Sequence, residues 1–277
     1  LESTGVRDGY ALAFGLAEGD LVEALVRNSA LRIIAADPDP AKVDHLRGRY
    51  VDAGLYGKRL TVLAGDPLTF QLPPYLASLI VFEDRKGQGS LGKEFITALY
   101  NSLRPYGGTL CLENGGAKNI PLVKTLQELD LPGADVVESQ GFLLLRREGP
   151  LPGAADWTHQ YGDIANTVKS DDRLVKLPLG LLWFGGSSNL DVLPRHGHGP
   201  PEQVVGGRLF IQGMDCFSAR DVYTGRVLWT KPLPDLENYG VYFDDTYRDA
   251  PLDTAYNQAH IPGANARGTN FIATPDW

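Results

Sequence analysis

The chain has 277 residues, of which 43% are hydrophobic and 22% charged, and it carries a net charge of −8 with a pI near 5.1. This composition is typical of a globular protein with a packed core and excludes a wholly disordered chain. The acidic balance argues against a nucleic-acid partner or an anionic membrane surface, because both need clustered lysine and arginine.

The first 147 residues alternate between strand-like and helix-like patterns. Short apolar runs predict buried strands, and apolar residues spaced by three or four predict helices. In chain order the expected elements are strand 10–14, helix 20–28, strand 31–36, a helix from Pro40, strands 60–64 and 76–82, helix 91–103, strand 108–112, helix 120–129, and a hairpin of 134–138 with 142–147. This alternation predicts an α/β domain with a mostly parallel sheet, and the closing hairpin makes the last strand antiparallel.

The pattern changes after about residue 148. Helical periodicity disappears, and short strand-like runs alternate with turns. The expected strands are 179–184, the pair 203–205 and 208–212 around Gly206-Gly207, and the pair 217–222 and 226–230. Both pairs predict β-hairpins. We therefore expect an α/β domain over 1–148 and an all-β segment over 149–277, whose stretch 232–277 is mainly loop.

Acidic and glycine-rich signals follow four of the expected strands. Carboxyl ends of parallel strands form the ligand-binding edge of such sheets, so these residues are expected to lie together. Glycines let a ligand approach the backbone, and a carboxylate after the second strand can accept both ribose hydroxyls of an adenosine. The candidate cofactor-binding residues are Gly15, Ala17, Gly19, Asp37, Pro38, Asp66, Pro67 and Glu83.

The stretch LAFGLAEG at 12–19 resembles the glycine motif of class I S-adenosylmethionine methyltransferases, whose ideal form is acidic-x-Gly-x-Gly-x-Gly. By the same resemblance, Asp37 matches the family's ribose-binding acid and Asp66 the aspartate at the adenine amino group. The stretch 103–108 resembles the Leu-x-Pro-Gly-Gly turn before the fifth strand. The resemblance covers roughly residues 5–147. It implies a Rossmann-like sheet of seven strands with the last antiparallel, and S-adenosylmethionine as cofactor.

Three positions depart from that family pattern. Ala13 stands in place of the motif's acidic residue, Ala17 in place of its middle glycine, and Ser78 where an aspartate is common. No sequence pattern points to a general base, so we assign no catalytic residues. Two hypotheses remain open: a methyltransferase acting on an unknown small molecule or protein, and a non-catalytic scaffold whose degenerate domain has lost the cofactor.

The segments 205–211 and 219–229 resemble one repeat of a pyrroloquinoline-quinone-type β-propeller, through Asp221, Thr224, Gly225 and Trp229. One blade cannot close a ring, so the remainder of the propeller is an expected partner. The whole arrangement resembles planctomycete proteins that join a methyltransferase-like domain to a quinoprotein-like propeller. This resemblance implies a bacterial protein, cytoplasmic or periplasmic, whose propeller recruits substrate. No adjacent cysteines are present, so we expect no bound quinone.

The remaining signals favour structural roles. His196 and His198 could share one side of a strand as metal ligands, but no third ligand is near in sequence, so a polar loop is favoured and no metal is predicted. Cys111 and Cys216 fall in different domains and predict no disulfide, with Cys111 in the core. No apolar run approaches the roughly 18 residues of a membrane span. The chain opens without methionine, so we read it as a piece of a longer protein.

Overall fold

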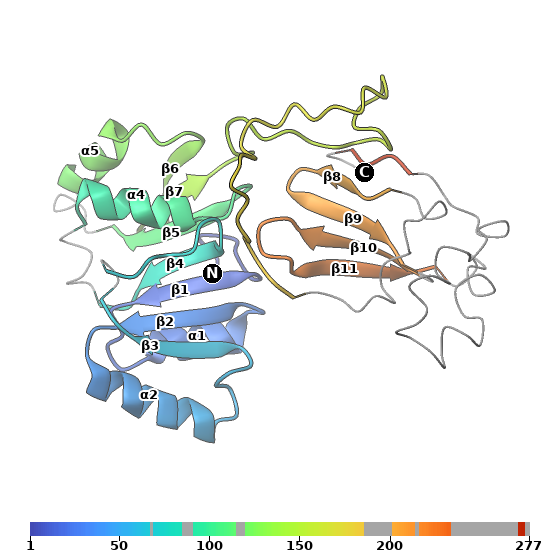
Figure 1. Ribbon diagram of the computed structural model, residues 1–277. Coiled ribbons are helices and arrows are strands. Elements are labelled where there is room, and N and C mark those ends of the chain that lie inside the picture. The colour runs from blue at the N-terminus through green and yellow to red at the C-terminus, as the bar shows by residue number, and fades with distance from the viewer. Residues whose placement is uncertain are drawn as a thin grey trace, which may run out of the picture. The chain divides into compact units, whose positions relative to one another are not determined.

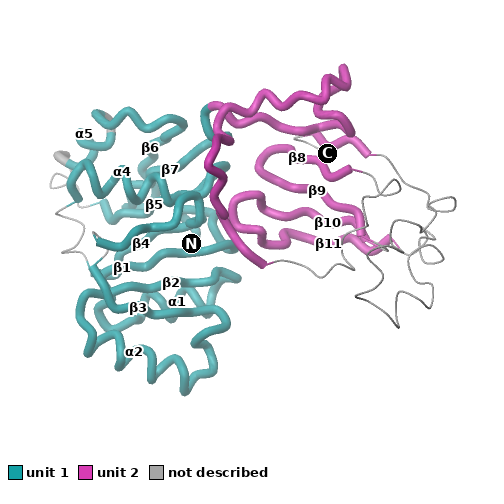
Figure 2. The backbone as a smooth tube through the Cα atoms, in the orientation of Figure 1, with its two compact units in different colours: residues 1–152 teal, residues 153–277 magenta. Residues whose placement is uncertain are grey.

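The computed structural model describes residues 1–66, 69–84, 91–114, 120–185, 201–213, 216–233 and 271–274. It divides into two compact units, Leu1–Pro152 and Gly153–Trp277 (Figure 2). The first carries an α/β sheet and the second a small antiparallel sheet. Within the described residues, no helix is long and apolar enough to cross a membrane.

Unit 1 is built on a seven-stranded sheet of order β3-β2-β1-β4-β5-β7-β6 (Figure 1). β7 is antiparallel to both of its neighbours, and the β1, β2, β3, β4 and β5 pairings are parallel. The strands are β1 (Tyr10–Phe14), β2 (Arg32–Asp37), β3 (Leu60–Ala64), β4 (Ala77–Phe82), β5 (Gly108–Glu113), β6 (Ala134–Ser139) and β7 (Phe142–Arg147). The helices are α1 (Asp20–Asn28), α2 (Pro40–Asp52), α4 (Lys93–Ser102) and α5 (Ile120–Glu128). The expected α/β fold with an antiparallel last strand is confirmed.

Two apolar layers hold the sheet between its helices. On one face, α1 and α2 pack on the sheet, and on the other face α4 and α5 do so (Figure 1). Along β4, Leu79 and Val81 join the first layer while Ile80 and Phe82 join the second. This alternation across a strand buried on both faces explains why its sequence is a continuous apolar run.

The start of α2 is fixed by its own sequence. Asp39 is the N-cap, and its Oδ1 accepts from the backbone N–H groups of Ala41 at 2.9 Å and Lys42 at 3.3 Å. Pro40 occupies the first helical position, where its missing N–H costs nothing. Because β2 ends at Asp37, this cap begins the helix directly at the carboxyl edge of the sheet.

Arg147, the last residue of β7, fastens that strand to the end of α4. Its Nη1 donates to the carbonyl oxygens of Tyr100 at 3.2 Å, Asn101 at 3.4 Å and Leu103 at 3.2 Å. The guanidinium carbon also lies 5.1 Å from the ring centre of Tyr75 and 4.9 Å from that of Tyr100. Carbonyls at a helix C-terminus carry partial negative charge, and aromatic faces attract cations. These contacts stabilise the charge of Arg147, a residue that is only 8% exposed.

Unit 2 contains four antiparallel strands paired in chain order. They are β8 (Gln203–Val205), β9 (Arg208–Gln212), β10 (Cys216–Asp221) and β11 (Val227–Pro232). Both predicted hairpins are present, β8 with β9 and β10 with β11. Phe210, Phe217, Trp229 and Phe271 pack together on one face. Cys111 and Cys216 are free thiols.

The strand expected at 179–184 is wrong. This segment forms no ladder, and it is held instead by Trp183, whose Nε1 donates to the carbonyl oxygen of Val222 at 2.8 Å. The Trp183 ring lies against Gly225, where an added Cβ would come within 2.3 Å of it. A side chain docked on the β10–β11 turn therefore positions the segment, and Leu179 and Leu181 stay exposed. The expected loop at 232–277 lies largely outside the described residues.

Candidate functional site

The four sequence signals of unit 1 follow four neighbouring strands. In the sheet order β3-β2-β1-β4, the residues at the carboxyl ends are Asp66, Asp37, Gly15 and Glu83. The backbone joins these ends directly, because Gly65 N–H donates to the carbonyl of Asp37 at 2.9 Å and Asp84 N–H to that of Gly15 at 2.8 Å. The structure therefore brings the predicted residues to one edge of the sheet.

The loop after β1 is shaped by two left-handed glycines. Gly15 has φ +59° and Gly19 has φ +81°, a region that favours glycine. At Gly19 an added Cβ would lie 2.6 Å from the Tyr50 hydroxyl and 2.8 Å from Leu46, so packing against α2 also requires glycine there. Ala17, between the two glycines, is exposed. The loop thus presents its middle to solvent while its ends are fixed.

Tyr50 holds the second of these glycines. Its hydroxyl donates to the carbonyl oxygen of Gly19 at 2.9 Å, and the residue is 1% exposed. Burial raises the pKa of Tyr50 to about 12, with the cation of Arg49 opposing and the carboxylate of Glu83 adding to the rise. The phenol therefore stays protonated at neutral pH and remains a hydrogen-bond donor to the loop.

Asp37 lies at the edge as predicted, but its carboxylate already has partners. The residue is 2% exposed. Its Oδ1 accepts from the N–H of Asp39 at 2.9 Å, and its Oδ2 lies 2.9 Å from Lys42 Nζ. Lys42 is the more accessible member of the pair, with 33% of its side chain exposed. A ribose hydroxyl at Oδ2 would therefore have to displace the Lys42 ammonium.

The other candidates at this edge differ in accessibility. Pro38 and Asp66 are exposed next to their strands. The Asp66 carbonyl accepts from the backbone N–H groups of Thr69 at 2.9 Å and Phe70 at 3.0 Å, which forms a turn after β3. Pro67 lies outside the described residues.

Glu83 is turned toward the start of α1. Its Oε1 accepts from the backbone N–H of Leu21 at 3.1 Å, the favourable position for an anion at a helix N-terminus. Its Oε2 is buried and has no hydrogen-bond partner. Glu83 therefore connects the carboxyl end of β4 to the helix that follows the glycine loop.

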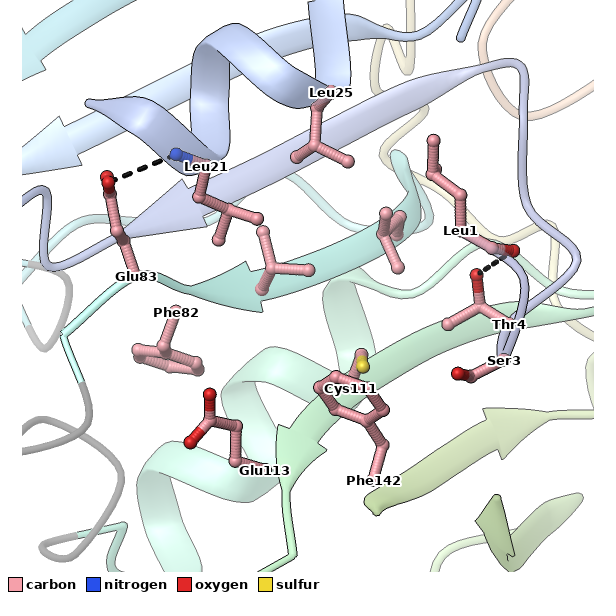
Figure 3. A pocket seen from close by; sticks show the side chains of 12 residues that line it. Leu1, Ser3, Thr4, Leu21, Leu25, Phe82, Glu83, Cys111, Glu113 and Phe142 are labelled. Carbon is pink, nitrogen blue, oxygen red and sulfur yellow. Dashed lines mark hydrogen bonds between the residues drawn. The ribbon is translucent and has the colours of Figure 1, made fainter. Parts of the chain in front are cut away.

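A cavity of about 260 Å³ opens on the α1 face of the sheet, beside β4, β5 and β7 (Figure 3). It is lined by Leu1, Ser3, Thr4, Leu21, Leu25, Leu79, Val81, Phe82, Glu83, Cys111, Glu113 and Phe142. Burial raises the pKa of the Cys111 thiol to about 11, so the thiol is neutral at physiological pH. Cys111 was expected in the core, but it is only half-buried and forms part of this wall.

Sequence reasoning missed Glu113 and Phe142 as site residues. The signal for Glu113 was present, because it ends β5 just as Glu83 follows β4. Phe142 pairs with Glu113 across β5 and β7, a contact that depends on the antiparallel insertion of β7. The local sequence around Phe142 does not predict that placement.

The described parts of the chain contain no group of three or more histidine, cysteine, aspartate or glutamate side chains able to hold a metal ion. His159 is within them, and its Nδ1 lies 2.7 Å from Thr158 Oγ1. His196, His198 and His260 lie outside the described residues.

A scan of protein-family models and a search of curated proteins both find no match. Among solved structures, the chain is similar to a candidate S-adenosylmethionine-dependent methyltransferase from Methanococcus maripaludis, at 16% identity over 53% of this chain and 80% of that one, with a TM-score of 0.46. It is also similar to such a methyltransferase from Aquifex aeolicus, at 15% identity over 53% and 86% of the two chains, with a TM-score of 0.43. A TehB-like methyltransferase from Corynebacterium glutamicum is 16% identical over 52% and 82%, with a TM-score of 0.40.

The topology of unit 1 classifies the fold by itself. Its seven strands follow the order 3-2-1-4-5-7-6, and β7 is inserted antiparallel between β5 and β6. A four-stranded antiparallel sheet follows in unit 2. About half of the chain therefore has the class I methyltransferase type of Rossmann-like fold.

Proposed function

We propose that unit 1 binds S-adenosylmethionine at the carboxyl edge of β3, β2, β1 and β4 and methylates a small-molecule or protein substrate. The observation that carries the proposal is the convergence of the Gly15–Gly19 loop, Asp37 and Asp66 on that edge. The loop would face the cofactor through its exposed middle at Ala17. Asp37 would accept from the ribose, and Asp66 from the adenine amino group. When bound, the cofactor supplies an electrophilic methyl group.

Binding of a ribose at Asp37 requires a ribose hydroxyl to replace the Lys42 ammonium as a partner of the carboxylate. Only Oδ2 must change partners, since Oδ1 keeps the N–H of Asp39. An ion pair between a buried carboxylate and a one-third exposed lysine contributes about 1–2 kcal/mol, whereas hydrogen bonds to a charged group contribute roughly 1.5–3 kcal/mol. Lys42 is one-third exposed and can return to solvent, so exchange for a ribose hydroxyl is favourable.

Glu83 takes a positioning role in this proposal. Its Oε1 holds the N–H of Leu21 and is not free to contact a ligand at the edge. It fixes the start of α1 and, through it, the end of the glycine loop at Gly19. Among the candidate residues, those that would contact the cofactor directly are therefore the glycine loop, Asp37, Pro38 and Asp66.

Calorimetry with S-adenosylhomocysteine tests the proposal. Asp37→Ala should weaken binding roughly tenfold to a hundredfold, because it removes charge-assisted hydrogen bonds. Asp66→Ala should weaken it less. Asp52→Ala, an exposed change at the far end of α2, is the matched control and should leave binding unchanged. Absence of binding by the wild-type chain at millimolar ligand defeats the enzyme proposal, and equal binding by Asp37→Ala defeats the site assignment.

The second candidate function is a non-catalytic scaffold. Two observations favour it. Each carboxylate oxygen of Asp37 already has a partner within the chain, and Ala13, in place of the motif's acid, is 0% exposed in the core. A domain that keeps the fold without the cofactor would show both features. The same calorimetry separates the two functions, since the scaffold gives no heat of binding.

We propose that unit 2 is one blade of a β-propeller that recruits the substrate. Four antiparallel strands paired in chain order are the arrangement of a propeller blade. Asp221 accepts from Tyr223 N–H and Thr224 Oγ1, which fixes the β10–β11 turn of the repeat motif. Trp229 is 42% exposed and would pack on a neighbouring blade. The low-resolution shape of the full-length protein tests this, because a blade requires a closed ring around it.

A further inference from the structure

Two carboxylates line the same end of the cavity in unit 1. β4 pairs in parallel with β5, with Leu79 opposite Thr109. Side chains alternate along a strand, so Leu79, Val81 and Glu83 share one face of the sheet, and Glu113 projects to the same face of β5. Neighbouring strands lie about 4.8 Å apart. Figure 3 shows Glu83 and Glu113 at the same end of the cavity.

The Glu83 carboxylate lacks half of its hydrogen bonding. Oε1 is held by Leu21 N–H, but Oε2 is buried without a donor. A buried acceptor without a donor costs about 1–3 kcal/mol, and more when the group is charged. The second negative charge, at Glu113, makes the same spot still more favourable for a cation. A positively charged donor in the cavity would satisfy Oε2 and offset the repulsion between the carboxylates.

The rest of the cavity is small and mainly apolar, although the hydroxyl-bearing Ser3 and Thr4 also line it. Its walls include Leu25 and Val81 on one side and Phe142 on the other (Figure 3). A volume of about 260 Å³ corresponds to about nine water molecules at ~30 Å³ each. Cys111 adds a neutral thiol to the wall. The chamber therefore suits a compact apolar body of about ten non-hydrogen atoms rather than an ion and its hydration shell.

We propose that this cavity binds a small organic amine. The protonated nitrogen lies between Glu83 and Glu113 and donates to Glu83 Oε2, and the apolar body packs against Leu25 and Phe142. The cavity lies on the α1 face of the sheet, at the β4 and β5 end of the carboxyl edge, whereas Asp37 and Asp66 lie at the β2 and β3 end of that edge. The inference concerns binding alone and does not depend on the proposed methyl transfer.

Calorimetry with two probes of equal size tests the site on the full chain. The first is 2-phenylethylammonium and the second is 2-phenylethanol, which has a hydroxyl in place of the ammonium. The ammonium should bind with a millimolar or tighter Kd, and the alcohol at least tenfold more weakly. Glu83→Gln keeps an oxygen acceptor for Leu21 N–H but removes the charge, so it should weaken ammonium binding about tenfold. Glu94→Gln, exposed on α4, is the control and should bind as the wild type does.

Three outcomes would overturn the proposal. One is equal binding of the two probes, or undiminished ammonium binding by a folded Glu83→Gln. Another is no ammonium binding at about 10 mM, which removes the site altogether. The third is displacement of the ammonium by S-adenosylhomocysteine, which assigns the cavity to the cofactor. The comparison of the two probes uses only the wild-type chain, so it still tests the proposal if Glu83→Gln fails to fold. Failure of S-adenosylhomocysteine to bind defeats only the proposed function.

Discussion

The ion pair between Lys42 and Asp37 controls access to the carboxylate proposed to hold the ribose. Lys42→Met removes the ammonium 2.9 Å from Asp37 Oδ2 and little else. Methionine keeps an unbranched apolar stem of similar length and has a similar helix propensity. The variant should therefore leave α2 in place while making Oδ2 available.

The magnitude follows from the burial of the two partners. The Asp37 side chain is 3% exposed and the Lys42 side chain 33%. Exposed pairs contribute about 1 kcal/mol or less, and breaking a fully buried pair costs about 3–5 kcal/mol, so this mixed pair contributes about 1–2 kcal/mol. A ribose that displaces Lys42 loses that contribution in the wild type but not in Lys42→Met. Affinity for S-adenosylhomocysteine should therefore rise roughly fivefold to thirtyfold.

The same interaction is missing from the unliganded variant, so its free energy of unfolding should fall by about 1–2 kcal/mol. Calorimetry measures the first effect and urea denaturation the second. Lys124→Met, on the exposed side of α5, is the control, because Lys124 lies 3.8 Å from Glu128 in a solvent-exposed pair. Lower stability with unchanged affinity would show that no ligand oxygen displaces Lys42. Lower affinity would show that Lys42 itself contacts the ligand.

Three further predictions follow from the contacts of unit 1. Tyr50→Phe should cost about 1 kcal/mol at pH 7, because Gly19 loses its 2.9 Å hydrogen bond. The folded pKa of Tyr50 is raised to about 12 from an unfolded value near 10, so its contribution to stability is complete below about pH 10 and lost toward pH 12. Denaturation of Tyr50→Phe should show a smaller loss over that window, and an identical loss would contradict this. The Cys111 thiol, with a pKa of about 11, should react with iodoacetamide at pH 8 at least tenfold more slowly than an ordinary thiol, as followed by mass spectrometry. Arg147→Met should lower the free energy of unfolding by about 1.5–3 kcal/mol, because it removes hydrogen bonds between a charged group and the carbonyls at the end of α4. Arg147→Lys should lower it by less, because an ammonium keeps the charge there. Unchanged melting of both variants would refute this role of Arg147.

The order of strands and helices in unit 1 could be predicted because each element has its own period. The strands β1 and β4 are buried on both faces and are therefore continuous apolar runs. The start of α2 is predicted by Asp39 as its N-cap and Pro40 as its first residue. The hairpin of β8 and β9 followed from two consecutive glycines. The segment around Trp183 could not be predicted, because it is held by a contact with Gly225 and Val222 some 40 residues away and not by a local pattern.

The location of the candidate site could be predicted, but not the directions of its side chains. A residue directly after a parallel strand must lie at the carboxyl edge, so the places of Asp37 and Glu83 followed from the strand ends. Their partners depend on helix placement, because Lys42 is the third residue of α2 and Leu21 is the second residue of α1. The cavity is lined by side chains from several strands that share one face of the sheet. Which side chains meet there depends on how the strands pair and cannot be predicted from any one segment.

The position of β7 has a consequence for how this unit is made. β7 is the last strand of unit 1 to be synthesised, yet it lies between β5 and β6. Until Phe142–Arg147 has left the ribosome, β5 presents an unpaired edge, β6 has no neighbour through which to join the sheet, and α4 ends without the Arg147 guanidinium. Exposed strand edges invite pairing with other chains, and incompletely folded nascent domains are vulnerable to it. A ribosome that stalls a few codons early would therefore leave the open sheet edge for chaperones to cover.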